Sequence, residues 1–235
     1  MKFGSLINVV KSNRLVYSSY MVARDTRSYL QSRSAGMYSQ HGEDVFIRDF
    51  FGAGFKGHYV DIGCSHPFRI SNTYLLYKSG WRGLCVDAIP HFGWLYRFWR
   101  PGDLFVNVGV GATAGRLVYH ELTPSVLSTF SAEYAAELIL GGRACPYKDY
   151  EIKVVNPNEL LEQFYEHKQI DVLSIDVESL DYEILSALDL KRFAPRLICV
   201  EFNDDTVRVA LNNLLGEAGY DCSRTVGCNI MAIKR

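Results

Sequence analysis

Short apolar runs alternate with amphipathic stretches through most of this chain, and the alternation restricts the folds that the chain can adopt. The apolar runs have the length and the β-branched content of buried strands, whereas the stretches between them carry apolar residues at helical spacing. Such a pattern predicts an α/β fold, a parallel sheet with helices on both faces. The expected strands are residues 58–63, 83–87, 104–108, 172–175 and 197–202, and the expected helices are residues 72–79, 90–98, 181–188 and 206–218.

Two further runs, residues 220–226 and 229–233, meet at a tight turn at Gly227. We expect a hairpin there, so the final strand would run antiparallel to the others. Five parallel strands completed by a hairpin match the seven-stranded, Rossmann-like sheet of class I methyltransferases better than a dinucleotide-binding Rossmann domain.

The chain contains no internal repeat, low-complexity tract or linker, so we expect one domain over residues 38–235. Residues 1–37 are expected to form an N-terminal helical extension that covers the cofactor or contacts a second subunit in a homo-oligomer. Residues 112–157 are an insertion between the third and fourth strands. Because open α/β sheets bind ligands at the carboxyl ends of their strands, this insertion is a candidate substrate lid.

Composition argues against several classes of partner. The formal net charge is -1 with no basic stripe, so a nucleic-acid partner is not expected. No apolar stretch approaches the roughly 18 residues of a membrane span, and no signal-peptide cleavage site follows the N-terminus. The six cysteines lack metal-ligand spacing. We therefore expect reduced thiols in a cytoplasmic protein.

The first expected strand ends in an Asp-Ile-Gly turn, residues 61–63. Glycine allows the backbone to turn tightly beside a ligand because it has no Cβ atom. A pyrophosphate cofactor would require GxGxxG, and this turn has only Gly63. A cofactor without phosphates needs just one close backbone approach. The alternative is a glycine that serves the turn alone.

Asp87 ends the second expected strand, where a carboxylate can accept hydrogen bonds from both hydroxyls of an adenosine ribose. The alternative for Asp87 is a helix cap ahead of Pro90. By the same geometry, Asn107 and Val108 at the end of the third strand would flank the adenine.

Six motifs together are recognisable, and they occur in one order. They are SQHGED at 39–44, YVDIG at 59–63, SNT at 71–73, GWRG at 80–83, VDA at 86–88 and LSIDVE at 173–178. The set resembles the FkbM family of methyltransferases over residues 38–203. The resemblance implies a class I fold, S-adenosylmethionine as cofactor and usually O-methylation, often of sugar hydroxyls.

The resemblance also implies a set of cofactor contacts. These are Gln40, Asp61, Gly63, Asn72 and Asp87. With them we count Ala88 and Asp176 from the same motifs, and Ser65 from the segment that follows the Asp-Ile-Gly turn. One position departs from the family pattern, because Ser179 stands where the family has a glycine after the Asp-Val-Glu run.

Asp176 and Glu178 are the candidate catalytic residues. An alcohol is a poor nucleophile at neutral pH, so methyl transfer to it benefits from a base. Carboxylates at the end of the fourth strand lie at the cleft, although helix capping is the alternative role. His66 is a second candidate base, since imidazole titrates near neutrality; the alternative is a turn residue before Pro67.

The same strand ends could instead hold a metal. Asp176, Glu201 and Asn203 offer oxygen ligands for Mg²⁺, which would acidify the hydroxyl. Three residues of the insertion, Tyr134, Arg143 and Tyr147, are candidate contacts to a sugar or an anion.

We expect an O-methyltransferase that acts on a hydroxyl of a sugar or glycoconjugate. The fourth strand is not followed by the Asn/Asp-Pro-Pro-aromatic run of enzymes that methylate nucleobase amino groups, and neither GxSxG nor a P-loop is present. The alternatives are another small-molecule or lipid-linked acceptor, methylation of nitrogen, and a non-catalytic subunit that keeps the cofactor fold.

Overall fold

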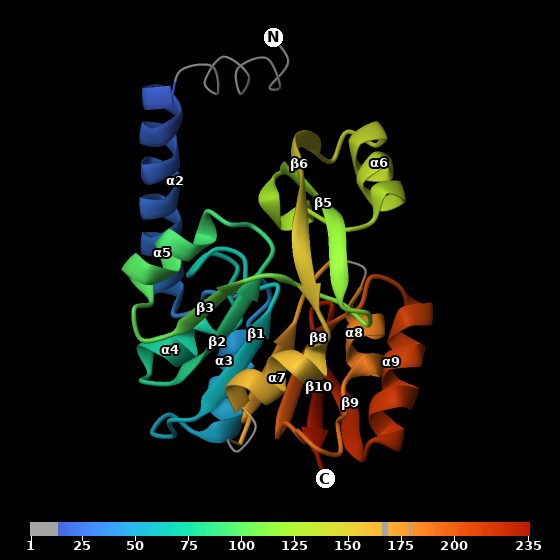
Figure 1. Cartoon of the computed structure of the whole chain (residues 1–235). Helices are drawn as coiled ribbons and strands as arrows, with labels where there is room; N and C mark the ends of the chain where they lie inside the picture. Colours follow the sequence, from blue (N-terminus) through green and yellow to red (C-terminus); the bar gives the residue numbers. More distant parts are fainter. Residues whose placement is uncertain (1–13, 166–168, 179) are drawn as a thin grey trace.

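The main sheet has seven strands, and Figure 1 shows them at the centre of the molecule. The computed structural model describes residues 14–165, 169–178 and 180–235. The spatial order of the strands is β3-β2-β1-β7-β8-β10-β9. β10 runs antiparallel to both of its neighbours, β8 and β9, and the other strand pairs of this sheet are parallel. This confirms the expected fold class and terminal hairpin. The strands are β1 (His58–Ile62), β2 (Arg82–Asp87), β3 (Leu104–Asn107), β7 (Val172–Ile175), β8 (Leu197–Glu201), β9 (Tyr220–Val226) and β10 (Asn229–Lys234).

Helices cover both faces of the sheet, because successive strand residues point to opposite sides. On β1, Val60 and Ile62 pack into one apolar core and Tyr59 packs into the other. The first core is closed by α7 (Pro157–Tyr165), α8 (Asp181–Ala187) and α9 (Asp205–Glu217). The second is closed by α3 (Glu43–Phe51), α4 (Tyr74–Lys78) and α5 (Phe92–Trp99).

The insertion forms a second, smaller sheet. The chain leaves the main sheet after Asn107, and β4 (Gly109–Val110) pairs in parallel with β6 (Cys145–Val155), which pairs in turn with β5 (Gly115–Thr123). Between the long strands lie η1 (Ser125–Leu127) and α6 (Ala132–Leu140). Figure 1 shows the β5–β6 hairpin rising from the edge of the main sheet. The insertion is therefore built around a long ordered hairpin.

The N-terminal segment contains one described helix, α2 (Arg14–Ala35). Its Tyr29 ring packs against Phe68 at 5.4 Å and against Trp99 at 5.6 Å between ring centroids. The expectation for residues 1–13 lies outside the described residues. No helix in the described part of the chain is both long enough and apolar enough to cross a membrane.

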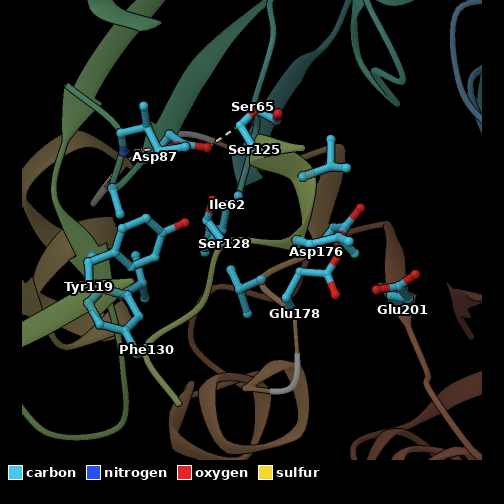
Figure 2. A pocket seen from close by; sticks show the side chains of 18 of the residues that line it. Ile62, Ser65, Asp87, Tyr119, Ser125, Ser128, Phe130, Asp176, Glu178 and Glu201 are labelled. Atoms are coloured by element: carbon cyan, nitrogen blue, oxygen red, sulfur yellow. Dashed lines mark hydrogen bonds between the residues drawn. The ribbon is translucent and has the colours of Figure 1, made fainter. Parts of the chain in front are cut away.

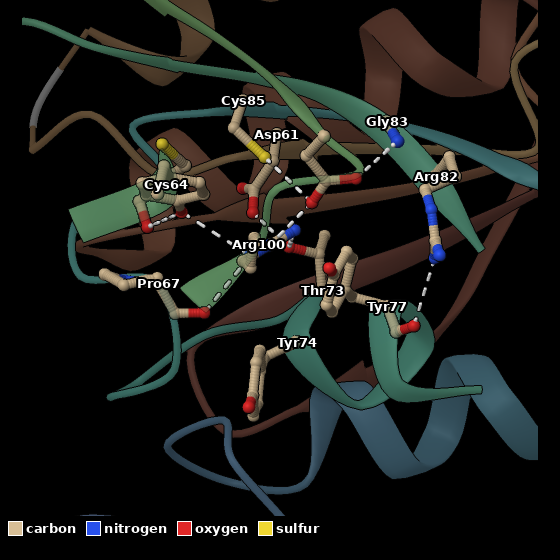
Figure 3. Close-up of polar contacts among 12 residues, drawn as sticks. Asp61, Cys64, Pro67, Thr73, Tyr74, Tyr77, Arg82, Gly83, Cys85 and Arg100 are labelled. Atoms are coloured by element: carbon tan, nitrogen blue, oxygen red, sulfur yellow. Dashed lines mark hydrogen bonds and ion pairs between the residues drawn. The ribbon is translucent and has the colours of Figure 1, made fainter. Parts of the chain in front are cut away.

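A buried ionic network lies beneath the ends of β1 and β2 (Figure 3). The side chains of Arg100 and Asp103 are both fully buried, and the Arg100 Nε lies 2.6 Å from Asp103 Oδ2. Arg100 also donates to the Tyr59 hydroxyl at 2.8 Å and to Thr73 Oγ1 at 3.0 Å. Through a further bond to the backbone oxygen of Pro67, at 3.3 Å, the network holds the loop that follows β1.

Candidate active site

A cavity of about 440 Å³ opens at the carboxyl ends of the parallel strands. It lies where the strand order reverses, since β1 pairs with β2 on one side and with β7 on the other. Figure 2 shows its two ends: Asp87 lies at one, beside Tyr119 and Phe130, and a group of carboxylates lies at the other. Open α/β sheets bind ligands at this switch point.

Gly63 shapes the floor of the cavity. Its φ is 80°, a conformation that favours glycine, and a Cβ atom there would lie 1.7 Å from the backbone oxygen of Asp176. Two residues later, the buried Ser65 Oγ has no hydrogen-bond partner among the described residues. Because an unpaired buried hydroxyl is costly, a ligand with polar groups fits this loop.

Asp87 lies at the end of β2 and lines the cavity, as expected for a ribose-binding carboxylate. Its two oxygens accept hydrogen bonds from the backbone N–H groups of Ser65, at 2.8 Å, and Ile89, at 2.7 Å. Burial raises the pKa of Asp87 to about 7, against the opposing effect of these bonds. Each oxygen still has a lone pair for a ribose hydroxyl.

The neighbours of Asp87 divide into lining and supporting residues. Ala88 and Val108 line the cavity. The Asn107 amide instead donates to the backbone oxygen of Asp87 at 2.9 Å, so Asn107 supports the loop from outside. The fit of this end to an adenosine is thus carried by Gly63, Ser65 and Asp87.

Three carboxylates gather at the other end. One oxygen of each of Asp176, Glu178 and Glu201 lies within 4.8 Å of the other two. Burial and the adjacent Glu201 raise the pKa of Asp176 well above its usual value, and they raise the pKa of Glu178 to about 8. Since like charges so close together disfavour full ionisation, this group holds protons near neutral pH.

The surroundings of the carboxylates come from two parts of the fold. Asn203 lines the cavity from beyond β8, and Tyr134 and Arg143 line it from the insertion. Arg143 opposes the rise in the pKa of Glu178. The buried Glu201 Oε2 has no hydrogen-bond partner in the described structure. Tyr147, a third insertion candidate, is 60% exposed and lies outside the cavity lining.

The backbone of Glu178 is held in the left-handed region, with φ 54°. Thr129 of the insertion donates from its hydroxyl to the backbone oxygen of Glu178 at 3.3 Å. The departure from the family pattern at Ser179 lies outside the described residues.

Besides Asn107 and Tyr147, three predicted site residues lie outside the cavity lining. Asp61 is buried and accepts a hydrogen bond from Thr73 in the network around Arg100 (Figure 3). The Asn72 amide donates to Ser174 Oγ at 3.2 Å. Both side chains therefore lie outside the cavity lining and support its loops from below, and direct contact of either with the cofactor stays a prediction. Gln40 does line the cavity.

His66, the second candidate base, also lies outside the cavity lining. Its ring is buried and packs against Phe68, 4.5 Å away, and against Phe92, 6.4 Å away. The chain turns sharply at Ser65, where φ is 47°, and this turn directs residue 66 into the aromatic core. The carboxylates remain as the candidate bases of the cavity.

Tyr119 and Phe130 line the cavity without having been predicted to do so. Tyr119 lies on β5 and Phe130 follows η1, and their ring centroids are 4.7 Å apart. The residues 125–130 stood out in the sequence only as part of the insertion. No local pattern indicates which face of the hairpin meets the sheet.

Comparison with known proteins gives one family match. Residues 61–222 match the family described as the methyltransferase FkbM domain. Among curated proteins, none matches the chain significantly.

Two solved structures resemble the chain at low identity. One is a TehB-like SAM-dependent methyltransferase from Corynebacterium glutamicum, with 12% identity, a TM-score of 0.45, and coverage of 92% of this chain and 99% of that chain. The other is the 1,6-didemethyltoxoflavin-N1-methyltransferase of Burkholderia thailandensis, solved with 1,6-didemethyltoxoflavin and S-adenosylhomocysteine. It shows 13% identity, a TM-score of 0.41, and coverage of 93% of this chain and 88% of that chain.

Proposed function

The chain belongs to the FkbM methyltransferase family and is an S-adenosylmethionine-dependent methyltransferase, and we propose that its acceptor is a hydroxyl of a sugar or glycoconjugate. The observation that carries the proposal is the group of three carboxylates at one end of the cavity, with raised pKa values at Asp176 and Glu178.

S-adenosylmethionine, when bound, supplies a methyl group on a positively charged sulfur. Asp87 and Ser65 would hold its adenosine part, and the Gly63 backbone would approach it closely. The acceptor then enters at the ends of β7 and β8, where Asp176 and Glu201 lie. In this arrangement the chain contributes orientation of the acceptor oxygen and removal of its proton.

Glu178 is the proposed base. A carboxylate with a pKa of about 8 binds a proton more strongly than an ordinary glutamate, so it removes a hydroxyl proton more effectively once it is ionised. Asp176 and Glu201 lie close enough to share that proton. A neutral amine can attack a methyl group before it loses a proton, so a base at this position favours a hydroxyl acceptor.

The remaining groups at this end suit a polyhydroxylated ligand. Asn203, Tyr134 and Arg143 offer hydrogen-bond donors, and the carboxylates offer acceptors. Each hydroxyl of a sugar can both donate and accept a hydrogen bond, and the C–H groups of the ring give it an apolar face. The Tyr134 ring adds an apolar surface for a sugar to pack against.

The test is a product assay. The protein is incubated with S-adenosylmethionine and a panel of mono- and oligosaccharides, and mass spectrometry records the addition of one methyl group and the atom that carries it. We expect methylation of an oxygen, lost in Glu178→Gln while S-adenosylhomocysteine still binds. Methylation of nitrogen, or of a lipid-linked or other small-molecule acceptor alone, would contradict the proposal. Cofactor binding without turnover on any acceptor would favour the non-catalytic alternative.

A metal-assisted reaction is a second candidate, favoured by the same three carboxylates. Their oxygens lie within 4.8 Å of one another, a spacing that suits one divalent cation. The expected ligand set of Asp176, Glu201 and Asn203 thereby gains Glu178. Calorimetry with Mg²⁺ alone, and turnover before and after chelation, distinguish the candidates: activity that survives chelation supports the base.

A further inference from the structure

Tyr119 and Phe130 form an aromatic wall at the Asp87 end of the cavity (Figure 2). The Tyr119 ring is buried and lies at 61° to the Phe130 ring. Behind it lies Tyr150 of β6, with its ring centroid 5.9 Å from that of Tyr119. The wall therefore belongs to the insertion and packs against the core on its far side.

Phe130 lies directly on the backbone of β4, which begins two residues after β3 ends. A Cβ atom on Gly109 would lie 2.5 Å from the Phe130 Cζ, so this approach requires a glycine. Gly109 follows Val108, which lines the same end of the cavity. If Asp87 holds the ribose, the adenine next to it lies beside Val108. The Phe130 ring covers this part of the chain.

The wall is held in place by hydrogen bonds at both of its edges. His120 and Thr129 exchange two backbone bonds, of 2.9 and 3.2 Å, which fold residues 125–130 against β5. The Ser128 hydroxyl accepts from the Leu122 N–H at 3.0 Å. On β6, the Tyr150 hydroxyl donates to the backbone oxygen of Ala88 at 3.4 Å.

The chemistry of the wall suits a flat, apolar base. Val108, Ile89 and Ala88 offer aliphatic surface from the sheet side, and the two rings offer aromatic surface from the insertion side. Burial, and then the nearby Asp87 carboxylate, raise the pKa of Tyr119 well above its usual value, so the phenol stays neutral. Stacking of an aromatic ring on a nucleobase contributes favourable binding free energy.

We infer that the insertion hairpin builds one wall of the adenine subsite, with Phe130 and Tyr119 as specificity-determining residues for the cofactor. The inference rests on the assigned cofactor and is independent of the proposed acceptor. In this assignment the insertion, which the sequence marks as a substrate lid, serves the cofactor through its inner face.

Calorimetric titration tests the wall without any acceptor. S-adenosylhomocysteine and 5′-methylthioadenosine, which lacks the amino-acid part, are each titrated into the wild type, Phe130→Ala and Phe130→Leu. We expect both ligands to bind about tenfold more weakly to Phe130→Ala, because the lost contact is to the base. Phe130→Leu keeps apolar volume but loses the flat ring, and is expected to bind both ligands more weakly than the wild type.

Phe105→Ala is the matched control. Phe105 is also a half-buried phenylalanine, but its ring stacks on Tyr96 outside the cavity, 5.0 Å away, so ligand binding should be unchanged. Thermal melting of the ligand-free proteins shows which variants fold. If Phe130→Ala does not fold, the binding measured for Phe130→Leu tests the inference. Unchanged binding in the folded Phe130 variants would overturn the inference, as would weaker binding of S-adenosylhomocysteine alone. If the Phe130 variants bind both ligands more weakly but the wild type methylates no sugar, the result contradicts only the acceptor proposal.

Discussion

The backbone of Gly63 lies against the backbone oxygen of Asp176, so close that a Cβ atom at residue 63 would be 1.7 Å from it. Two motifs more than one hundred residues apart in the chain meet at this contact, because β1 and β7 are neighbours in the sheet. The turn after β1, which is proposed to hold the cofactor, and the end of β7, which carries the Asp176 carboxylate, therefore form one structural unit.

Gly63→Ala is expected to disrupt this unit. The added methyl group must displace the Asp176 backbone, and φ of 80° strains any side chain. We expect the free energy of unfolding, measured in urea, to fall by about 2–3 kcal/mol, with loss of S-adenosylhomocysteine binding. Gly52→Ala is the control, because Gly52 has φ of 87° but no atom within 4 Å of the added Cβ. Equal effects of the two substitutions would show that the contact with Asp176 is unimportant.

Cofactor binding should depend on pH through Asp87. The pKa of this carboxyl is raised to about 7, and ribose hydroxyls donate to its ionised form. Binding therefore favours loss of the proton, and affinity should rise as pH increases through 7. We expect the Kd of S-adenosylhomocysteine to fall severalfold from about pH 6 to about pH 8. Asp87→Asn should bind weakly with little pH dependence, and a pH dependence kept in that variant would point to another group.

Glu178→Gln should separate chemistry from cofactor binding. A glutamine side chain cannot take up the proton of the hydroxyl that is methylated, so we expect kcat to fall about 100-fold or more. The Kd of S-adenosylhomocysteine should stay near the wild-type value. In the wild type, kcat/KM should rise with pH towards 8, because the proposed base must be ionised. Glu183→Gln on α8, exposed to solvent, is the control and should keep full activity. Wild-type turnover in Glu178→Gln would transfer the role to Asp176.

Asp103→Ala should destabilise the fold more than any exposed ion-pair substitution. It leaves the Arg100 guanidinium fully buried without its carboxylate partner. We expect a loss of about 3–5 kcal/mol in the free energy of unfolding, measured by chemical denaturation. Glu151→Ala removes an exposed partner of Arg116 and should cost less than about 1 kcal/mol. A similar small cost at Asp103 would mean that water or the tyrosines compensate the buried charge.

Local patterns were sufficient to predict the frame of the site. Strand periodicity located β1, β2, β7 and β8, and each strand end brought its polar residue to one edge of the sheet. Gly63, Asp87 and Asp176 line the cavity as their positions after strands suggested. Three of the described helices were not predicted: α3, α6, which lies within the insertion, and α7, which begins at the last residue of the insertion.

Other features depended on packing between distant segments. Asp61 and Asn72 lie in the recognised motifs and His66 follows one of them. Hydrogen bonds to Thr73 and Ser174, and packing in the aromatic core, hold these three side chains away from the cavity. The local sequence does not indicate these side-chain directions, because a shift of one residue along a turn can point a side chain to the opposite side. Glu178 likewise joins Asp176 and Glu201 through a left-handed backbone that Thr129 supports.

The sequence by itself determined the sheet, its terminal hairpin and the edge at which the cavity opens, because strand and helix periodicities and turn glycines act over a few neighbouring residues. Only the tertiary structure decided which side chains enter the cavity and which lie beneath it. The inner face of the hairpin, with Tyr119 and Phe130, meets β4 just beyond the end of β3, through contacts that no short segment contains.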